Sequence, residues 1–158
     1  MNKSALIDKI IKALRSELET YVRAANSSHE EATAEENRAE NKYDTRGLEA
    51  SYLATGQANK VMELEDAIGA FEDLKAKSFD ESAIDVGALV ELDQNGEKAF
   101  YFIGPNAGGT EITDGVHEVL VITPQSPLGA QLQGRQQGER LKLMLAGAKQ
   151  QIQIVNVC

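Results

Sequence analysis

Apolar positions in the first half of the chain recur at alternating steps of four and three. Heptad spacing of this kind is typical of a helix that packs along a partner helix. Ser4 suits the N-cap of such a helix, and neither Pro nor Gly occurs between Met1 and Arg46. The pattern therefore predicts one long helix over about 5–39. The positions on its seam are Ile7, Ile11, Leu14, Leu18, Tyr21, Ala25, Ser28 and Ala32.

A second helical series follows a short polar turn, in which Asp44, Thr45 and Gly47 supply turn and cap chemistry. A long helix cannot bury an apolar stripe alone, and a short connection makes two helices antiparallel neighbours. We therefore expect residues 1–77 to form an antiparallel helical hairpin, a coiled coil. The apolar positions of the second helix are Leu48, Tyr52, Ala54, Ala58, Val61, Leu64, Ile68, Phe71 and Leu74.

The stretch that joins the two helical series, His29 to Glu49, is crowded with carboxylates and nearly lacks large apolar residues. Charge runs usually face water, so a solvated turn is the simpler interpretation. The alternative is a functional tip, because carboxylates at the end of a helical rod can hold a hard cation such as Mg²⁺ through oxygen ligands. Acidity alone does not decide between the two.

Strand-like runs replace the helical pattern after a polar linker at 78–82. The pair Asn95-Gly96 is typical of a tight hairpin turn. A short helix is expected over 126–134, with Ser126 as its N-cap and Pro127 in its first turn. The sequence therefore predicts an α+β fold whose second domain, 83–158, is a mostly antiparallel sheet with one short helix. The strand-like runs are 88–92, 98–103, 117–122, 140–145 and 151–157.

Composition narrows the classes of function. The 158-residue chain has a formal net charge of -9, which argues against broad attraction to DNA or anionic membranes. No apolar run approaches the roughly 20 residues that span a bilayer, so we expect no membrane partner. Cys158 is the only cysteine, so no internal disulfide can form. With no signal-peptide core at the start, a cytoplasmic location is expected.

Sets of catalytic residues are scarce. The two histidines, His29 and His117, do not lie in a metal-ligand spacing, and a zinc site is not expected. The glycine-rich run 104–109 lacks the Lys-Ser/Thr pair of a phosphate-binding loop. Phe100, Tyr101 and Phe102 either line a pocket or belong to the core, and the core is the more usual place for aromatic residues on a strand.

Two segments carry a resemblance to a known family. Ser126-Pro127-Leu128-Gly129 lies in 122–135, and this segment resembles the Ser-Pro-hydrophobic-Gly-x-x-Leu-x-Gly-Lys signature of the GreA/GreB transcript-cleavage factors of bacterial RNA polymerase. Residues 137–141 continue the likeness, and 50–54 resembles the Tyr-bearing start of the family's second helix. The likeness extends over nearly the whole chain and is most specific in its C-terminal half.

The resemblance implies both an architecture and a partner. It implies an FKBP-like C-terminal domain that docks at the rim of the polymerase secondary channel, with Ser126, Pro127, Leu128 and Gly129 shaping the docking surface. The hairpin is then expected to reach through the channel toward the catalytic Mg²⁺ and, indirectly, the 3′ end of the nascent RNA. On this interpretation the protein is not an enzyme. It is an elongation factor that stimulates the polymerase's own cleavage of backtracked RNA.

The tip departs from the family pattern, in which an Asp and a Glu stand three residues apart, the Glu followed by Asn, shortly before a Tyr. Asp44 corresponds to the Asp, with one extra residue before Tyr52, and Leu48 or Glu49 stands where the Glu is expected. The resemblance implies that Asp44 coordinates a second Mg²⁺ shared with the polymerase active site. Glu49 is its expected helper. Glu36 and Glu40 are the next candidates.

Three alternatives remain open at this point. A non-cleaving regulator of the secondary channel would share the architecture and use the altered tip to block or tune the active site. An FKBP-like prolyl isomerase with a helical handle, or a purely structural coiled-coil adaptor, would need no polymerase contact at all.

Overall fold

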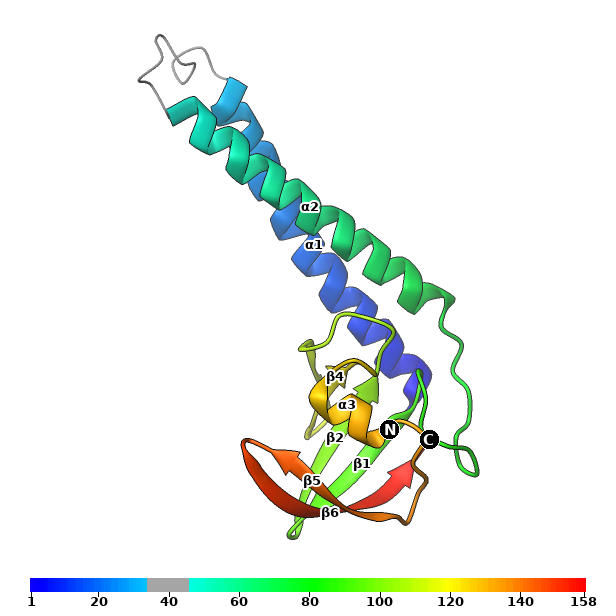
Figure 1. Cartoon of the computed structure of the whole chain (residues 1–158). Coiled ribbons are helices and arrows are strands. Elements are labelled where there is room, and N and C mark those ends of the chain that lie inside the picture. The colour runs from blue at the N-terminus through cyan, green and yellow to red at the C-terminus, as the bar shows by residue number, and fades with distance from the viewer. Residues whose placement is uncertain (34–45) are drawn as a thin grey trace. The chain divides into compact units, whose positions relative to one another are not determined.

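The computed structural model describes residues 1–33 and 46–158 (Figure 1). In this described part, two long helices precede a mixed six-stranded sheet and a short helix, which confirms the predicted α+β fold class. The FKBP-like character of the sheet domain stays a prediction. The elements are α1 Lys3–Thr33, α2 Arg46–Asp73, β1 Leu89–Gln94, β2 Glu97–Ile103, β3 Glu111–Asp114, β4 His117–Ile122, α3 Pro127–Leu132, β5 Arg140–Leu145 and β6 Ala148–Val157.

The helix bounds follow the hydrophobic spacing closely at three of their four ends. α1 begins two residues before the predicted start, whereas its predicted end near 39 lies outside the described residues. Gly47 was assigned to the turn, and this is wrong, because it lies inside α2, which begins at Arg46.

Parts of both long helices form one compact unit, Leu14–Ile68, which we call the hairpin unit. Within it the two helices lie side by side and run in opposite directions (Figure 1). The Lys60 ammonium lies 5.9 Å from the centroid of the Tyr21 ring, a contact between α2 and α1. Leu14 and Leu64 are buried, as the predicted seam requires. Packing of the coiled-coil type stays a prediction.

The sheet has the strand order β3-β4-β2-β1-β6-β5, in which β2 and β4 are parallel and the other four pairings are antiparallel. The predicted Asn-Gly hairpin is confirmed, since Gln94 pairs with Glu97 and both Asn95 and Gly96 have positive φ. The sequence did not predict β3. This strand has four residues and only Ile112 is buried, so it shows no alternation long enough to recognise.

Each face of the sheet buries a different set of side chains. On one face Leu132 of α3 joins the hydrophobic core. On the other face the Phe71 ring of α2 lies 6.2 Å from the Phe102 ring of β2, measured between centroids, and both rings are fully buried. Side chains that are neighbours along a strand point to opposite faces, so Phe102 and Ile103 serve the two different cores. The core on the α3 face contains Phe79, Ile84, Ala88, Val90, Leu92, Ile103, Ile122, Leu132, Leu143, Ile152, Ile154 and Val157.

The second compact unit consists of Met1–Ala13 and Gly69–Cys158, and we call it the sheet unit. It includes the first turns of α1 as well as the sheet. Lys9 Nζ lies 2.6 Å from Asp114 Oδ1 on β3, and the Lys3 ammonium lies 4.7 Å from the Phe79 ring centroid. The two compact units are divided in the sequence between residues 13 and 14 and between residues 68 and 69, whereas the predicted linker is 78–82. The predicted domains 1–77 and 83–158 therefore stay a hypothesis about independent folding.

Candidate functional site

The segment that carries the family resemblance folds as a short, N-capped helix. Ser126 is the N-cap of α3, and its hydroxyl accepts a hydrogen bond from the Gly129 N–H at 3.1 Å. The same hydroxyl donates to the Thr123 carbonyl at 2.7 Å. Pro127 follows in the first turn, where its missing N–H costs nothing because that position has no intrahelical partner. Ser126 and Pro127 thus begin the helix as the sequence predicts.

Gly129 has no room for a side chain. A Cβ built on it would lie 1.8 Å from the Thr123 carbonyl oxygen and 2.7 Å from its carbon. These are backbone atoms that cannot turn aside. A glycine at this position therefore lets the chain before α3 fold tightly against the first turn of the helix.

Side chains and backbone groups at the end of α3 join the helix to two other segments of the sheet unit. The Gly134 N–H donates to the Ile84 carbonyl at 2.9 Å, and the Ile84 N–H donates to the Arg135 carbonyl at 2.7 Å. On the other side, Gln131 Oε1 accepts from the Met144 N–H of β5 at 3.2 Å. Because α3 is tied on both sides, its exposed face has a fixed position on the sheet unit.

The four residues predicted to bind a partner differ in their access to solvent. Pro127 is exposed and Leu128 is half-buried with its side chain against the core. Ser126 is half-buried with its hydroxyl already engaged, and Gly129 is buried. Pro127 and Leu128 are thus placed to touch a partner directly, whereas Ser126 and Gly129 hold the segment in shape. Their role in docking stays a prediction.

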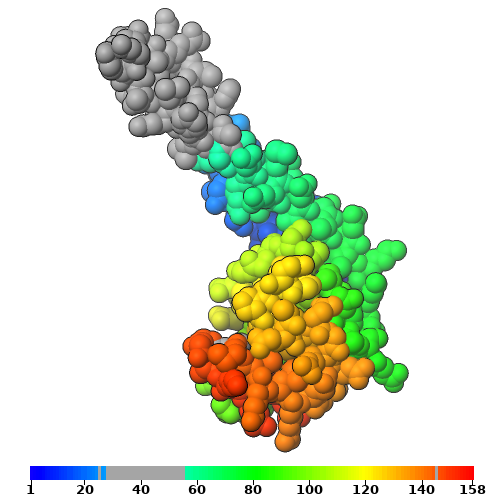
Figure 2. Space-filling model, in the orientation of Figure 1, coloured from blue at the N-terminus to red at the C-terminus, as the bar shows by residue number. Residues whose placement is uncertain are grey.

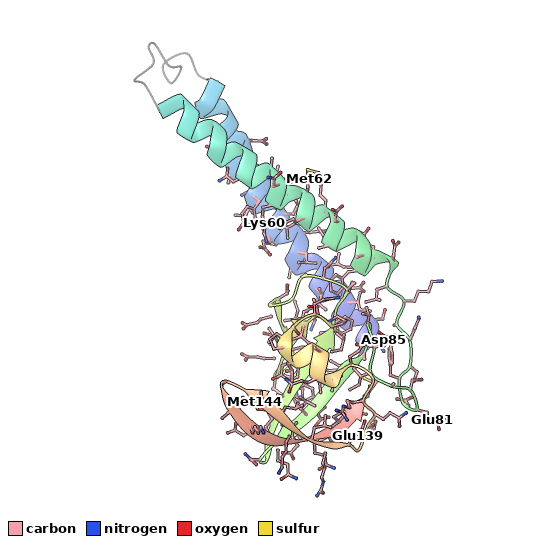
Figure 3. All side chains as sticks on the ribbon, viewed as in Figure 1. Lys60, Met62, Glu81, Asp85, Glu139 and Met144 are labelled. Carbon is pink, nitrogen blue, oxygen red and sulfur yellow. The ribbon has the colours of Figure 1, made fainter. Side chains whose placement is uncertain are left out.

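Asp85 lies beside the end of α3 and is labelled in Figure 3. Its carboxylate accepts hydrogen bonds from Gln133 Nε2 at 2.9 Å and from the Val86 N–H at 2.7 Å. The Gln133 hydrogen bond is the main cause that lowers the Asp85 pKa below its ordinary value of 3.8, and the Val86 N–H and the Lys77 charge act in the same direction.

Replacing Gln133 by Ala is expected to raise the pKa of Asp85 toward 3.8, because the charged carboxylate loses its main hydrogen-bond donor. A lowered pKa in the folded state stabilises the fold above the unfolded pKa and is lost as pH falls through the folded one. The variant should therefore lose less stability in acid than the wild type. An NMR titration of the Asp85 carboxyl carbon checks this, with Gln131→Ala as the control. An unchanged pKa in Gln133→Ala would contradict the assignment.

The predicted metal ligands fall mainly outside the part of the chain that the structure describes. Asp44, Glu36 and Glu40 lie outside the described residues, and for Glu49 only the backbone is described, in the first turns of α2. Among residues 1–33 and 46–158, no group of three His, Cys, Asp or Glu side chains is arranged to hold a metal ion. The Mg²⁺ prediction thus rests on the sequence alone.

The membrane prediction can be compared with the helices directly. Within the described residues, no helix is both long enough and apolar enough to cross a bilayer.

The aromatic run on β2 divides between the core and an open hollow of about 410 Å³. Phe102 is fully buried, whereas Phe100 and Tyr101 line the hollow together with His117. The Phe100 and His117 rings lie 4.6 Å apart between centroids. No Ser, Thr or Cys is among the residues that line this hollow, and Tyr101 is the lining residue that carries a hydroxyl group.

Comparisons with known proteins give structural neighbours only. No protein-family model matches the chain, and no curated protein matches its sequence. The structure is similar to GreA factor homolog 1 (Gfh1) of Thermus thermophilus, with 21% identity over 94% of each chain and a TM-score of 0.40. It is also similar to Gfh1 of Thermus aquaticus, with 21% identity over 92% of each chain and a TM-score of 0.41.

A third neighbour is the prokaryotic transcription elongation factor GreA/GreB from Nitrosomonas europaea. The identity is 19%, over 73% of this chain and 94% of that one, with a TM-score of 0.37. The structural neighbours are thus transcription factors of the Gfh1 and GreA/GreB type.

Proposed function

We propose that this protein is a Gre-type factor that binds bacterial RNA polymerase through its sheet unit. The observation that carries the proposal is the agreement between the signature in 122–135 and its local structure. Ser126 caps α3, Gly129 allows the close backbone approach, and Leu132 is fully buried in the core. The residue types of the signature therefore have definite structural roles here, and Pro127 and Leu128 are left at the surface for a partner.

On this proposal, α3 docks at the rim of the secondary channel and the hairpin carries Asp44 toward the catalytic centre. A carboxylate there suits Mg²⁺, which prefers oxygen ligands and is commonly held by one or two carboxylates with other partners. The bound metal supplies charge stabilisation for phosphodiester hydrolysis. This chain contributes the Asp44 carboxylate and its delivery, with Glu49 as helper, and the polymerase performs the cleavage.

Direct binding to core RNA polymerase tests the proposal first. We expect the wild-type protein to bind the core enzyme, and Pro127→Ser to bind more weakly with an unchanged melting temperature. The physical reason is that Pro127 is exposed, so its loss removes contact area from an interface and little from the fold. Fluorescence anisotropy with a labelled protein measures the binding. If the wild type shows no binding to the core enzyme, the proposal is wrong.

Asp44→Asn separates a cleavage factor from a channel regulator. The substitution keeps the size of the side chain and removes the charge that favours Mg²⁺. We expect polymerase binding near wild type and a loss of RNA cleavage of at least about tenfold, or roughly 1.4 kcal/mol of transition-state stabilisation. Glu49→Gln should show a smaller loss. The assay follows the cleavage of RNA in a stalled elongation complex over time.

The altered tip favours a second candidate function, a regulator that occupies the channel without stimulating cleavage. Leu48 or Glu49 stands where the family pattern has a Glu followed by Asn, so one of the two family carboxylates lacks a clear equivalent. A wild-type protein that binds polymerase yet stimulates no cleavage at any Mg²⁺ concentration would support the regulator. If the wild type and Asp44→Asn cleave equally well, Asp44 is not a metal ligand.

A further inference from the structure

Basic residues gather at the C-terminal end of this acidic chain. Positions 119–158 hold four basic residues and one acidic residue, whereas positions 1–118 hold 12 basic and 24 acidic residues. One of the four, Arg135, has a partner, since its Nη1 lies 3.6 Å from Glu139 Oε1. The other three are Arg140 and Lys142 on β5 and Lys149 on β6. The β5–β6 ribbon therefore carries the unpaired positive charge of this part of the chain.

The register of the ribbon places these three cations on one face. Residues that lie directly opposite each other on paired strands, and residues two apart on one strand, share a face of a sheet. The neighbours on the strands, such as Leu143 and Ile152, point the other way into the core. We call the outward side the cationic face. Its cross-strand pairs are Arg140–Gln153, Lys142–Gln151 and Met144–Lys149.

The charges on the cationic face are exposed and unneutralised. Arg140, Lys142 and Lys149 are all exposed, and none of them forms an ion pair with any residue in the described part of the chain. Residues two apart on a strand are separated by about 6.6 Å, and diagonal cross-strand neighbours by about 7–8 Å. Like charges at these distances repel one another, so the arrangement does not stabilise the fold of the free protein.

An apolar side chain lies among these charges. Met144 is 50% exposed and lies on β5 (Figure 3). The ribbon is the orange-to-red part of the molecular surface in Figure 2. Exposed Met and Arg side chains are enriched at protein interfaces. An exposed Met beside Arg, Lys and Gln side chains thus has the composition of a protein-binding surface with a polar, cationic rim.

Two classes of anionic partner could bind such a face, a nucleic acid or an acidic protein surface, and the sequence favours the protein surface. Nucleic acid binding gains from aromatic side chains that stack on bases, but positions 103–158 contain no Phe, Tyr or Trp. The net charge of -9 also repels a polyanion at long range. A folded protein surface needs neither stacking nor a basic protein as a whole, only local complementarity of charge.

We propose that the cationic face binds a carboxylate-rich protein surface. The inference rests on the proposed function, so the partner that presents this surface is RNA polymerase itself. The face adds a second contact to the one made by α3, at a different place on the sheet unit. Its part is electrostatic: Arg140, Lys142 and Lys149 pair with carboxylates, Gln151 and Gln153 donate hydrogen bonds, and Met144 packs at the surface.

A protective role for the same lysines gives a different expectation. β5 is an edge strand, and charged side chains on edge strands discourage pairing between molecules. The edge is, however, already partly covered, because the Met144 N–H donates to Gln131 of α3. Edge protection predicts that neutral variants aggregate while the monomer keeps its affinity for the polymerase.

The test compares the wild type with two triple variants that have the same net charge as each other. The first variant is Arg140→Gln with Lys142→Gln and Lys149→Gln. The control, Lys12→Gln with Lys75→Gln and Lys77→Gln, changes the net charge equally at exposed lysines outside the ribbon. Binding is measured by anisotropy on core RNA polymerase free of nucleic acid, and again on a stalled elongation complex. Thermal unfolding and light scattering monitor folding and aggregation.

We expect the ribbon variant to bind the core enzyme at least about fivefold more weakly than the wild type near 0.05 M salt, with the difference closing near 0.5 M as screening grows. The control should bind within about twofold of the wild type. Because the triple change could impair folding, Gln151→Glu serves as a second variant. It places a carboxylate among the cations and is expected to weaken binding in the same salt-dependent way.

Several outcomes would overturn the inference, and they differ from a failure of the proposed function. If the wild type does not bind core polymerase, both the function and the inference are wrong. If the wild type binds and both ribbon variants bind equally well, the inference alone is wrong, even if those variants aggregate. A loss that appears only on the elongation complex would assign the cations to phosphate groups and would also overturn it.

Discussion

Gly129→Ala is expected to destabilise the sheet unit by roughly 3 kcal/mol or more, at or above the upper end of the cost of about 1–3 kcal/mol that is typical of overpacking, because a backbone segment has to move. The added methyl group would lie 1.8 Å from the Thr123 carbonyl oxygen and 2.8 Å from Ser126 Oγ. Relief of this clash requires the Thr123–Ser126 turn to open. Opening would break the Ser126–Thr123 hydrogen bond and remove the N-cap of α3.

Denaturant unfolding followed by circular dichroism measures this loss, and Gly69→Ala is the matched control. Gly69 lies in α2 with nothing within 4 Å of the position of its added Cβ, so the same substitution should stabilise the helix by about 0.5–1 kcal/mol. The same substitution, Gly to Ala, is thus expected to lower the free energy of unfolding at position 129 and to raise it at position 69. If Gly129→Ala keeps wild-type stability and loses only polymerase binding, Gly129 acts in the docking surface and not in the fold.

The elements that were predicted well are those that have a long, regular pattern or a specific turn motif in the sequence. The heptad series gave both long helices, and the Asn95-Gly96 pair gave the turn between β1 and β2. The short helix was predicted from local chemistry, because Ser126 and Pro127 are typical of the start of a helix and act without tertiary contacts. The sequence did not predict β3 because this strand is short and forms through its pairing with β4, which a local pattern does not show.

Contacts between distant segments were beyond the sequence patterns. The chain's periodicity changes near the linker at 78–82, so the sequence favours a boundary there. The ion pair between Lys9 and Asp114, which are far apart in the sequence, nevertheless joins the start of α1 to the sheet. The spacing of residues along the sequence does not predict a contact of this kind. The same holds for the cationic face, which needs the β5–β6 register before its residues can be recognised as neighbours.

The candidate site was predicted in part. The signature identified the α3 segment, but only the structure separates Pro127, which is exposed, from Gly129, which is buried. Sequence alone treats both as members of one motif. A simple signal was available for Gly129, since a glycine near the start of a helix is unfavourable unless backbone must approach closely. The roles of Asp44 and Glu49 remain predictions from the resemblance.

The second large effect is expected for Phe71→Ala, which should destabilise the sheet unit by about 3–5 kcal/mol. Phe71 is fully buried, its ring contacts that of Phe102, and its Cζ lies 2.9 Å from the position that a Cβ on Gly104 would occupy. The truncation would leave a cavity between the end of α2 and β2. Neighbouring residues can fill it only in part, because Phe102 is held in the sheet by pairing with both β1 and β4.

Phe71→Ala also decides between two views of the domains. If 83–158 folds independently of the helices, the substitution should melt the end of α2 while the β2 amides keep their protection from hydrogen exchange. If the sheet unit is one cooperative structure, Phe102 and its neighbours on β2 should lose protection together with α2. Met62→Ala, at a side chain of α2 that is 62% exposed, is the control and should change stability by less than about 0.5 kcal/mol. We expect the joint loss, because the Phe71 and Phe102 rings share one buried contact, and undiminished β2 protection in Phe71→Ala would favour the boundary at 78–82 instead.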